Sequence, residues 1–474
     1  MDANTNAAPP SGAVGPGAAR PGGFQQRWGW LLRHARAVAA STLVRRLATD
    51  AFWSLLGSVL ARLLALVASI AVARRLGATA FGEFNLVQTT AGMLMALGGF
   101  GLNTTATKYL AGNYRADPEA AGRVVALSGM VAAFVGGGTG VLLAASAGWV
   151  AESVLGAPQL STALRVGSVL LLFGPVNGTQ LGTLMGLQRF RTIGLVTTVT
   201  SALSIPLLIG GALLGGTLGC VIGLVASSAV TTGLYAVAVR RATRACGLRP
   251  VYRQALREWR ILFSYSIPTT LGNVLLAPAT WATSAVVANQ PGGVRELGLF
   301  AAANQWRNAI VLVATSVGAV MFPLFAHLHD SGRTRSFARA FWASVVLTAL
   351  ASVAAAGGLA VSAPWIMRAY GAEFRDAVDV MVLLLVAGAL AAPLSIVGHA
   401  IAGAGRMWLS FALNAAWAIV LVAAAYGLRS RGAFGLSVAY AAAYAVHLGA
   451  ALACARGVLN GTRAPAMATV ALDG

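Results

Sequence analysis

The run from Thr192 to Val239, which contains no charged side chain, constrains this chain more than any other feature. As a single helix it would be about 72 Å long, more than twice the ~30 Å hydrocarbon core of a bilayer. The run must therefore fold back on itself as two membrane helices. The pair Gly215-Gly216 predicts the turn between them.

The rest of the 474 residues repeats this pattern, with 57% hydrophobic and only 10% charged side chains. Long apolar runs of this kind indicate an all-α, polytopic membrane protein. We predict twelve spans in two lobes of six helices, at residues 50–74, 83–107, 122–147, 163–187, 192–214, 217–239, 260–288, 297–326, 338–361, 377–403, 407–428 and 433–455.

Five regions follow from these spans. We expect a disordered tail and an interfacial amphipathic helix over 1–49, an N-terminal lobe over 50–240, and a basic cytoplasmic linker over 241–259. A C-terminal lobe over 260–456 and a tail over 457–474 complete the chain. Of the 34 Lys and Arg residues, 24 lie on the side of the two termini, which favours cytoplasmic termini.

The net charge of +21 does not indicate a nucleic-acid partner, because the arginines lie between apolar spans and not in a basic patch laced with aromatic residues. The three cysteines are far apart and form no metal-ligand spacing. There is no GxxxxGK[ST] motif, so we expect no ATP hydrolysis and no cofactor.

The two halves repeat at nearly one spacing. Gly82-x-Phe84 recurs as Gly298-x-Phe300 and Trp149 recurs as Trp365, both at the same offset. Two more pairs follow the same order: Gly156-Ala157 with Gly371-Ala372, and Gly186-x-x-Arg189 with Gly403-x-x-Arg406. Since each half holds six spans, the copies have the same orientation, and their pseudo-twofold axis should lie along the membrane normal, with a central site between the halves.

The motifs at the first loop resemble those of a known family. Ala73-Arg74-Arg75-Leu76-Gly77 followed by Phe81-Gly82-x-Phe84 is similar to the first loop of polysaccharide (O-antigen or exopolysaccharide, Wzx-type) flippases. These flippases belong to the multidrug/oligosaccharidyl-lipid/polysaccharide exporter superfamily. Met321-Phe322-Pro323-Leu324 and Gly186-x-x-Arg189 fit the same pattern, and Ala78-Thr79-Ala80 departs from it where Pro or acidic residues are usual.

The resemblance covers about residues 50 to 456 and implies two six-helix lobes around a cavity that opens alternately inward and outward. It also implies a lipid-linked oligosaccharide as cargo, moved across a bacterial inner membrane for surface polysaccharide synthesis. The implied partners are this lipid, the membrane lipids, and a polysaccharide polymerase with its chain-length machinery.

Arg62 is the strongest candidate for a functional residue. It lies about 18 Å from either end of its span, too deep to reach the membrane surface easily. Ser54, Ser58 and Arg62 share a helix face that should point at the cavity, where the guanidinium could bind a pyrophosphate through two hydrogen bonds. The alternative is an arginine satisfied by backbone carbonyls in the packed interior.

In span eight, Asn304, Arg307 and Asn308 share a face suited to hydroxyl and phosphate groups, although Arg307 could instead extend to the outer surface. Further polar residues point to the same cavity or to hydrogen bonds between helices. These further candidates are Asn85, Gln88, Asn177, Gln180 and Asn273.

The acidic residues all lie in loops or at span ends. A cation-coupled drug exporter would be expected to hold a carboxylate in its core, and here the intramembrane charge is positive. An anionic cargo is therefore favoured over a multidrug exporter of the same superfamily. A membrane-embedded polymerase is a third possibility, disfavoured by the short external segments. We expect no enzymatic activity.

Overall fold

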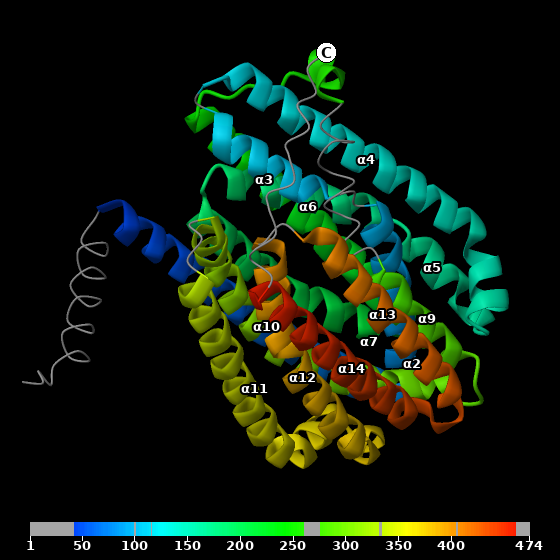
Figure 1. The fold of residues 1–474 in the computed structure, drawn as a ribbon. Coiled ribbons are helices and arrows are strands. Elements are labelled where there is room, and N and C mark those ends of the chain that lie inside the picture. The colour runs from blue at the N-terminus through cyan, green and yellow to red at the C-terminus, as the bar shows by residue number, and fades with distance from the viewer. Residues whose placement is uncertain are drawn as a thin grey trace, which may run out of the picture. The chain divides into compact units, whose positions relative to one another are not determined.

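The computed structural model describes residues 42–98, 101–114, 116–259, 275–330, 334–403 and 406–460. Every element of regular secondary structure within these residues is helical (Figure 1). By its contacts the chain forms two compact units, Met1–Phe52 and Trp53–Gly474, and the second contains all twelve predicted spans apart from the start of 50–74. The protein is an all-α, polytopic membrane protein, as the apolar runs predict.

The helices of the first half are named by their bounds. They are α2 (Thr42–Gly98), α3 (Leu102–Asn113), α4 (Pro118–Trp149), η1 (Val150–Val154), η2 (Pro158–Leu160), α5 (Ser161–Gly167), α6 (Leu170–Gly186), α7 (Phe190–Ala245) and η3 (Tyr252–Glu258).

The second half continues in the same way. Its elements are α9 (Leu276–Ala288), α10 (Gly293–Asp330), α11 (Thr334–Tyr370), η5 (Ala372–Ala377), α12 (Val378–Gly403), α13 (Met407–Gly427), η6 (Arg429–Arg431) and α14 (Gly432–Asn460). Seven helices of the described chain are long and apolar enough to cross a membrane, and one of these is the Phe190–Ala245 segment.

That segment contains the predicted hairpin. Within α7 the helix is broken at Gly215 (φ −150°, ψ 23°) and Gly216 (φ 55°, ψ −133°), which confirms the turn. A positive φ with this ψ is accessible almost only to glycine. In the same way α2 turns at Gly77 (φ 77°), between the first two predicted spans.

One span predicted as a single helix is interrupted in the structure. The span 83–107 is not a single helix, because α2 ends at Gly98 and α3 begins only after Gly101, which has φ 58°. Three glycines within residues 98–101 weaken the helix here, since glycine has the highest conformational entropy to lose. Residues 24–41 of the predicted interfacial helix and the tail from 461 lie outside the described residues.

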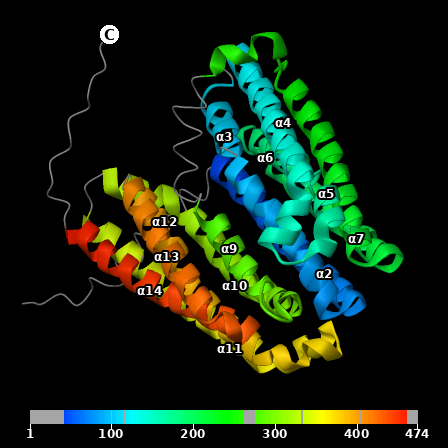
Figure 2. The same cartoon turned by 90° about the vertical axis from the view of Figure 1, so that its right-hand side faces the viewer.

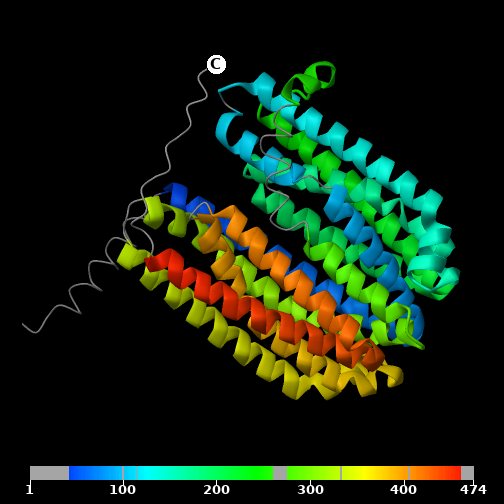
Figure 3. The ribbon, with the colours of Figure 1, turned by 45° about the vertical axis from the view of Figure 1, so that its right-hand side comes forward.

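The helices pack in two groups. In the first half α6 contacts α3, α4 and α7, and α5 contacts α7. In the second half α12 contacts α10, α11 and α14, while α13 contacts α9 and α14. Figures 2 and 3 show the cyan and green helices α3 to α7 on one side and helices α9 to α14 on the other.

Among the described residues, the core that the two groups share lies at one end. One cluster of buried side chains contains Phe81 and Leu164 from the first half together with Phe300 and Phe374 from the second. We call this the Gly77 end. At the opposite end each half has its own cluster, one around Leu110 and Leu184 and the other around Phe325 and Phe341.

The predicted repeat is visible in the backbone. A Cβ on Gly82 would collide with the carbonyl oxygen of Val294, and one on Gly298 would collide with that of Ala78. Since Val294 lies as far after Ala78 as Gly298 lies after Gly82, this contact is reciprocal at the predicted offset. Gly216 and Gly432 share φ 55°, with ψ −133° and −134°.

Candidate functional site

Arg62 extends from α2 to α10 in the other half. Its Nη2 donates a hydrogen bond of 2.9 Å to the backbone carbonyl of Gln305. The backbone of Gly57, on roughly the opposite side of α2, packs against Gly194 of α7. The first part of α2 therefore lies between α7 and α10, and Arg62 is half-buried between the two halves.

The hydrogen bonding of Arg62 is incomplete. One N–H meets a backbone carbonyl, as the structural alternative for this residue expects. Its Nε is buried and has no hydrogen-bond partner. An unsatisfied donor on a buried cation is costly, because both desolvation and the missing bond destabilise it. The guanidinium thus keeps one donor that no described group satisfies.

Arg307 of α10 is held by more contacts. Its Nε donates to Asn304 Oδ1 at 2.6 Å, its Nη2 to Asn308 Oδ1 at 2.7 Å and its Nη1 to the Tyr444 hydroxyl at 3.0 Å. The guanidinium carbon lies 5.1 Å from the centroid of the Tyr440 ring. These neutral oxygens and the aromatic ring stabilise the charge, and within the described residues Arg307 forms no ion pair.

Arg307 is only 8% exposed, so it does not extend to the surface as the alternative for span eight allowed. Gly388 of α12 makes this possible, because its missing side chain leaves room for the Arg307 stem, whose Cγ lies 3.1 Å from an ideal Cβ there. Three of the five guanidinium N–H groups are used, and two remain.

Both arginines involve the same turn of α10. Arg62 binds the carbonyl of Gln305, which is one residue from Asn304 and two from Arg307. One cation comes from each half, and the Asn304 and Asn308 side chains accept hydrogen bonds from Arg307. The Asn304, Arg307 and Asn308 side chains of span eight are thus in contact, and Arg62 of α2 binds the backbone of the same turn.

Three residues that the sequence did not single out lie close to Arg62. The Tyr370 hydroxyl, at the end of α11, faces the side chains of Ser69 and Trp306 and interacts with the charge of Arg62. The polar atoms of all three are buried without a well-formed hydrogen bond. Ser69 follows Arg62 by two helical turns, and this spacing could have revealed it.

The remaining predicted residues lie elsewhere. Asn85 and Gln88 are half-buried on α2. The amide oxygens of Asn177 and Gln180 on α6 are buried without a partner, and Gln180 lines a cavity between α4, α6 and α7. The side chain of Ser58 and all of Asn273 lie outside the described residues.

The acidic residues have other contacts. Glu373 accepts a hydrogen bond from the backbone N–H of Ala78, and Glu296 accepts one from that of Ala433. Both N–H groups belong to helix starts that follow a glycine with positive φ, at Gly77 and Gly432. Carboxylates at such positions accept hydrogen bonds from the free N–H groups of the first turn, and their negative charge interacts favourably with the positive end of the helix dipole.

The described residues contain no group of three or more His, Cys, Asp or Glu side chains that could hold a metal ion. Arg62 contacts the other half through Gln305, and Arg307 lies on the same helix as Gln305. The arrangement can bind an anion through guanidinium N–H groups, amides and hydroxyls.

Comparison with known proteins decides the family. Residues 47–329 match the profile of the family described as "Polysaccharide biosynthesis protein". The chain belongs to this family. The matched segment covers most of the first half, the linker, α9 and all but the end of α10, so both arginines lie within it.

Two curated relatives of this polysaccharide biosynthesis protein are each named "EPS I polysaccharide export inner membrane protein EpsE". The relative from Ralstonia nicotianae is 28% identical over 63% of this chain and 69% of its own length. The relative from Ralstonia solanacearum is 30% identical over 41% of this chain and 45% of its own length.

Solved structures extend the likeness past residue 329. The inward-facing conformation of a multidrug resistance MATE family transporter of the MOP superfamily has a TM-score of 0.71 and 18% identity, covering 87% of this chain and all of that one. The outward-facing conformation of a MATE family transporter has a TM-score of 0.65, with 16% identity over 88% and 96% of the chains. At this identity the likeness shows the fold.

Proposed function

We propose that this protein is a flippase that moves undecaprenyl-pyrophosphate-linked oligosaccharide units across the bacterial inner membrane. The observation that carries the proposal is that one arginine from each half lies at the same turn of α10: Arg62 binds the backbone of Gln305, and Arg307 is held by neutral groups. Neither arginine forms an ion pair within the described residues. The name of the two EpsE relatives, polysaccharide export inner membrane protein, supports the same assignment.

The charge favours an anionic cargo. A pyrophosphate offers several oxygens to guanidinium groups, and such charge-assisted hydrogen bonds are roughly twice as strong as neutral ones. The Nε of Arg62 and two N–H groups of Arg307 remain available for them. A cationic drug would meet two positive charges here, so the multidrug alternative is disfavoured.

Alternating access is the transport mechanism that the packing supports. The two halves share one core at the Gly77 end and have separate cores at the other end. If the Gly77 end faces the periplasm, as the arginine distribution predicts, this state is open to the cytoplasm. The headgroup would enter from the inside while its lipid tail stays in the bilayer.

The cellular setting follows from the proposal. The protein would lie in the inner membrane with both termini in the cytoplasm and would catalyse no covalent step. Its partners would be the lipid-linked oligosaccharide, membrane lipids, and the polymerase and chain-length machinery that consume the exported units. No nucleic acid is involved.

Complementation tests the role of Arg62. In a strain that lacks the gene, we expect complete repeat units to accumulate on the cytoplasmic side, measured by extraction of lipid-linked intermediates. Arg62→Ala should fail to restore export although the protein reaches normal levels. Arg75→Ala is the matched control, because Arg75 lies on the same helix and is exposed.

Three outcomes would contradict the proposal. Full complementation by Arg62→Ala would show that Arg62 makes no essential contact with the cargo. Export of single, unpolymerised units from the deletion strain would instead indicate a polymerase. A purified protein that moved cationic dyes but no lipid-linked sugar would identify a multidrug exporter.

A further inference from the structure

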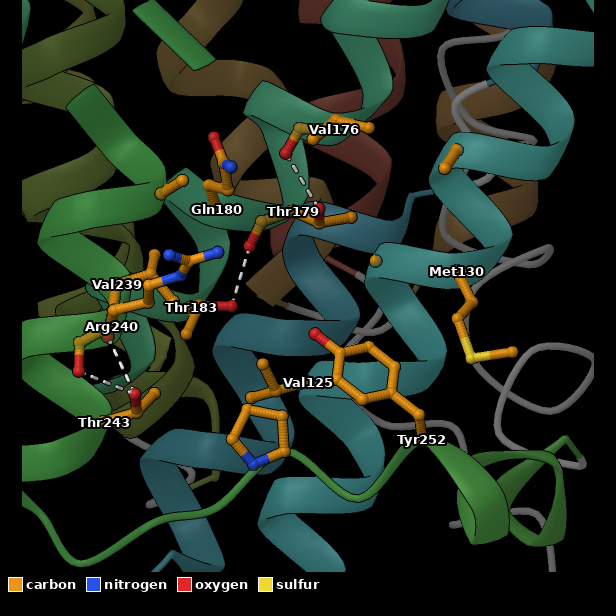
Figure 4. A pocket seen from close by; sticks show the side chains of 14 residues that line it. Val125, Met130, Val176, Thr179, Gln180, Thr183, Val239, Arg240, Thr243 and Tyr252 are labelled. Atoms are coloured by element: carbon orange, nitrogen blue, oxygen red, sulfur yellow. Dashed lines mark hydrogen bonds between the residues drawn. The ribbon is translucent and has the colours of Figure 1, made fainter. Parts of the chain in front are cut away.

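A cavity of about 390 Å³ lies inside the first half, away from α10. It is enclosed by α4, α6, the last turns of α7 and the segment that follows α7 (Figure 4). Its volume is within the range of ~300–1,000 Å³ that is typical of small-molecule sites. The proposed cargo site between the halves does not include it.

The lining of the cavity changes from apolar to polar. Its apolar part is formed by Met130 and Ala133 of α4, which are exposed on the outer side of the helix, and by Val176 of α6. An exposed apolar face of a membrane helix contacts lipid, so the cavity opens toward the bilayer. This shape suits a molecule with an apolar chain and a polar head.

The polar part of the cavity carries a positive charge. Arg240 of α7 extends toward α6, and the hydroxyl of Tyr252 points into the space between α4 and α6 (Figure 4). The lining contains no acidic residue. Within the described residues, Arg240 forms no ion pair that would neutralise it.

The hydroxyl groups and the amide of the lining supply acceptors. Thr179 and Thr183 line the cavity and donate their hydroxyl protons to backbone carbonyls of α6, so toward a guest each hydroxyl can act only as an acceptor. The amide oxygen of Gln180 is buried and has no partner. A guest with both an anionic group and a hydroxyl donor would satisfy Arg240 and Gln180 together.

The wall of the cavity beyond α7 is a strap that docks on α4, and it belongs to the basic linker expected over 241–259. The Arg249 carbonyl packs against Gly122, where a Cβ would collide with it. Ala255 is fully buried beside Ala126, and Arg123 Nε pairs with Glu258 Oε1 at 2.9 Å. These contacts fix the segment that carries Tyr252 over the cavity.

The opposite face of this strap has the composition of a membrane interface. Leu256 and Trp259 are 65% and 50% exposed, and the exposed Arg253 and Arg257 lie among them. Exposed aromatic rings with arginines are enriched at the level of lipid headgroups, and basic pockets on the cytoplasmic side bind anionic headgroups. The cavity mouth thus lies at headgroup depth.

We propose that this cavity binds one anionic phospholipid with a hydroxylated headgroup, of the phosphatidylglycerol class. Arg240 and Tyr252 contact its phosphate, Gln180 accepts a hydrogen bond from a headgroup hydroxyl, and an acyl chain follows Met130 and Val176 into the bilayer. The site is independent of the proposed cargo path.

Native mass spectrometry of the full chain, stripped of lipid in detergent, tests this. We expect one tightly retained phosphatidylglycerol and no comparable phosphatidylcholine. Arg240→Gln should weaken retention about fivefold, since one arginine near an anionic surface contributes ~1 kcal/mol. Arg241→Gln, which removes the same charge from an exposed neighbour outside the lining, should change retention less than twofold.

A cavity-filling variant gives a second test that leaves the charge intact. Gly129 lines the cavity and has no atom within 4 Å of an ideal Cβ, so Gly129→Met should fill the space and abolish retention. Gly138→Met on the same helix, equally open but outside the lining, is its control. Thermal unfolding without lipid shows that each variant folds.

Several results would overturn the proposal. If Arg240→Gln and its control Arg241→Gln lost retention of phosphatidylglycerol equally, the effect would come from the general surface charge and not from the cavity. If inorganic phosphate bound as tightly as phosphatidylglycerol, the cavity would be a site for phosphate and not for a lipid. Displacement of phosphatidylglycerol by undecaprenyl phosphate would assign the cavity to the cargo, and the absence of selective retention would leave no site.

Discussion

The two halves of this protein meet in two ways, and the comparison separates scaffold from site. At the Gly77 end, Gly82 packs on Val294 while Gly298 packs on Ala78, so each half makes the same contact with the other. In the middle of the bundle, Arg62 reaches Gln305 and no equivalent contact runs in the other direction among the described residues.

The offset between the repeats explains the difference. The position that matches Arg62 holds Pro278, and the position that matches Arg307 holds Ala91, and neither can donate a side-chain hydrogen bond. Each half therefore gives one cation, from a different helix of its repeat. At the Gly77 end the paired positions hold the same residue type, glycine, and the contact is made by backbone atoms.

The contrast shows which constraint acts on each region. Two helices that approach until their backbones touch need small residues on both sides, which preserves symmetry. A binding site for an unsymmetrical molecule needs particular side chains at particular positions, and this requirement breaks the symmetry between the halves. If this interpretation is correct, substitutions at the two regions should affect different properties.

Among variants of the second half, the largest effect on transport is expected at Arg307. Arg307→Gln removes a charge that makes three hydrogen bonds and faces Tyr440. Because charge-assisted hydrogen bonds contribute about 1.5–3 kcal/mol each, flipping of lipid-linked sugar in vesicles should fall about 100-fold. Arg307→Lys keeps the charge but loses the planar fork, and about a tenfold loss is expected.

Arg295, on the first turn of the same helix, has a side chain that is 42% exposed, and its control variant Arg295→Gln should transport normally. If Arg307 serves only to hold α10 against α14, transport and thermal stability should fall together, and Lys should not rescue. Equal thermal stability of Arg307→Lys and wild type, with reduced transport, supports the binding role.

At the Gly77 end, symmetry makes a different prediction. Gly82→Ala and Gly298→Ala each place a Cβ against a backbone carbonyl, which cannot move as a flexible side chain would. Overpacking of this kind costs roughly 1–3 kcal/mol, so each should lower the thermal unfolding temperature in detergent, by similar amounts. Gly92→Ala, on the same helix with open space around it, is the control.

Unequal losses in the two glycine variants would show that the contact is not used symmetrically. A second measurement sharpens the point: if this end must separate during transport, the variants should also increase labelling of a cysteine placed at the buried Ala78. If both cysteine labelling and thermal stability stayed unchanged, the contact at Gly82 and Gly298 would have no part in the transport cycle.

Much of the scaffold is predictable because its signals are local. The uncharged run predicts the α7 hairpin, and the turn lies at Gly215-Gly216. The constant offset between the halves predicts which glycines correspond, and Gly82 and Gly298 are in contact. Membrane helices are recognisable by length and composition, since the bilayer fixes both.

The rest depends on tertiary contacts that no local pattern records. Ser69, Trp306 and Tyr370 come from three helices and meet only after packing. The docking of the segment after α7 on α4 rests on Gly122 and Ala255, which carry no motif. Arg62 can be identified from its depth in the predicted membrane span alone, because a charge near the middle of the bilayer is costly whichever way its side chain points.

The smallest predicted effect joins the two regions. Glu373 caps the helix that starts at Ala78, from the opposite half, with a hydrogen bond of 2.8 Å. Loss of a cap of this type costs about 1 kcal/mol, and exposure of the carboxylate at the surface lowers that further. Glu373→Gln should therefore reduce the unfolding temperature by a few degrees at most, while Asp376→Asn, an exposed neighbour, should not change it.

Its effect on the state of the bundle is more informative than its effect on stability. Glu373 joins the halves, so losing its charge should favour separation of the Gly77 end without touching either arginine. Flipping should then change in rate while the affinity for lipid-linked sugar stays constant. A change in affinity instead would mean that the contact between the halves and the cation pair are coupled, and that scaffold and site are not separable in this protein.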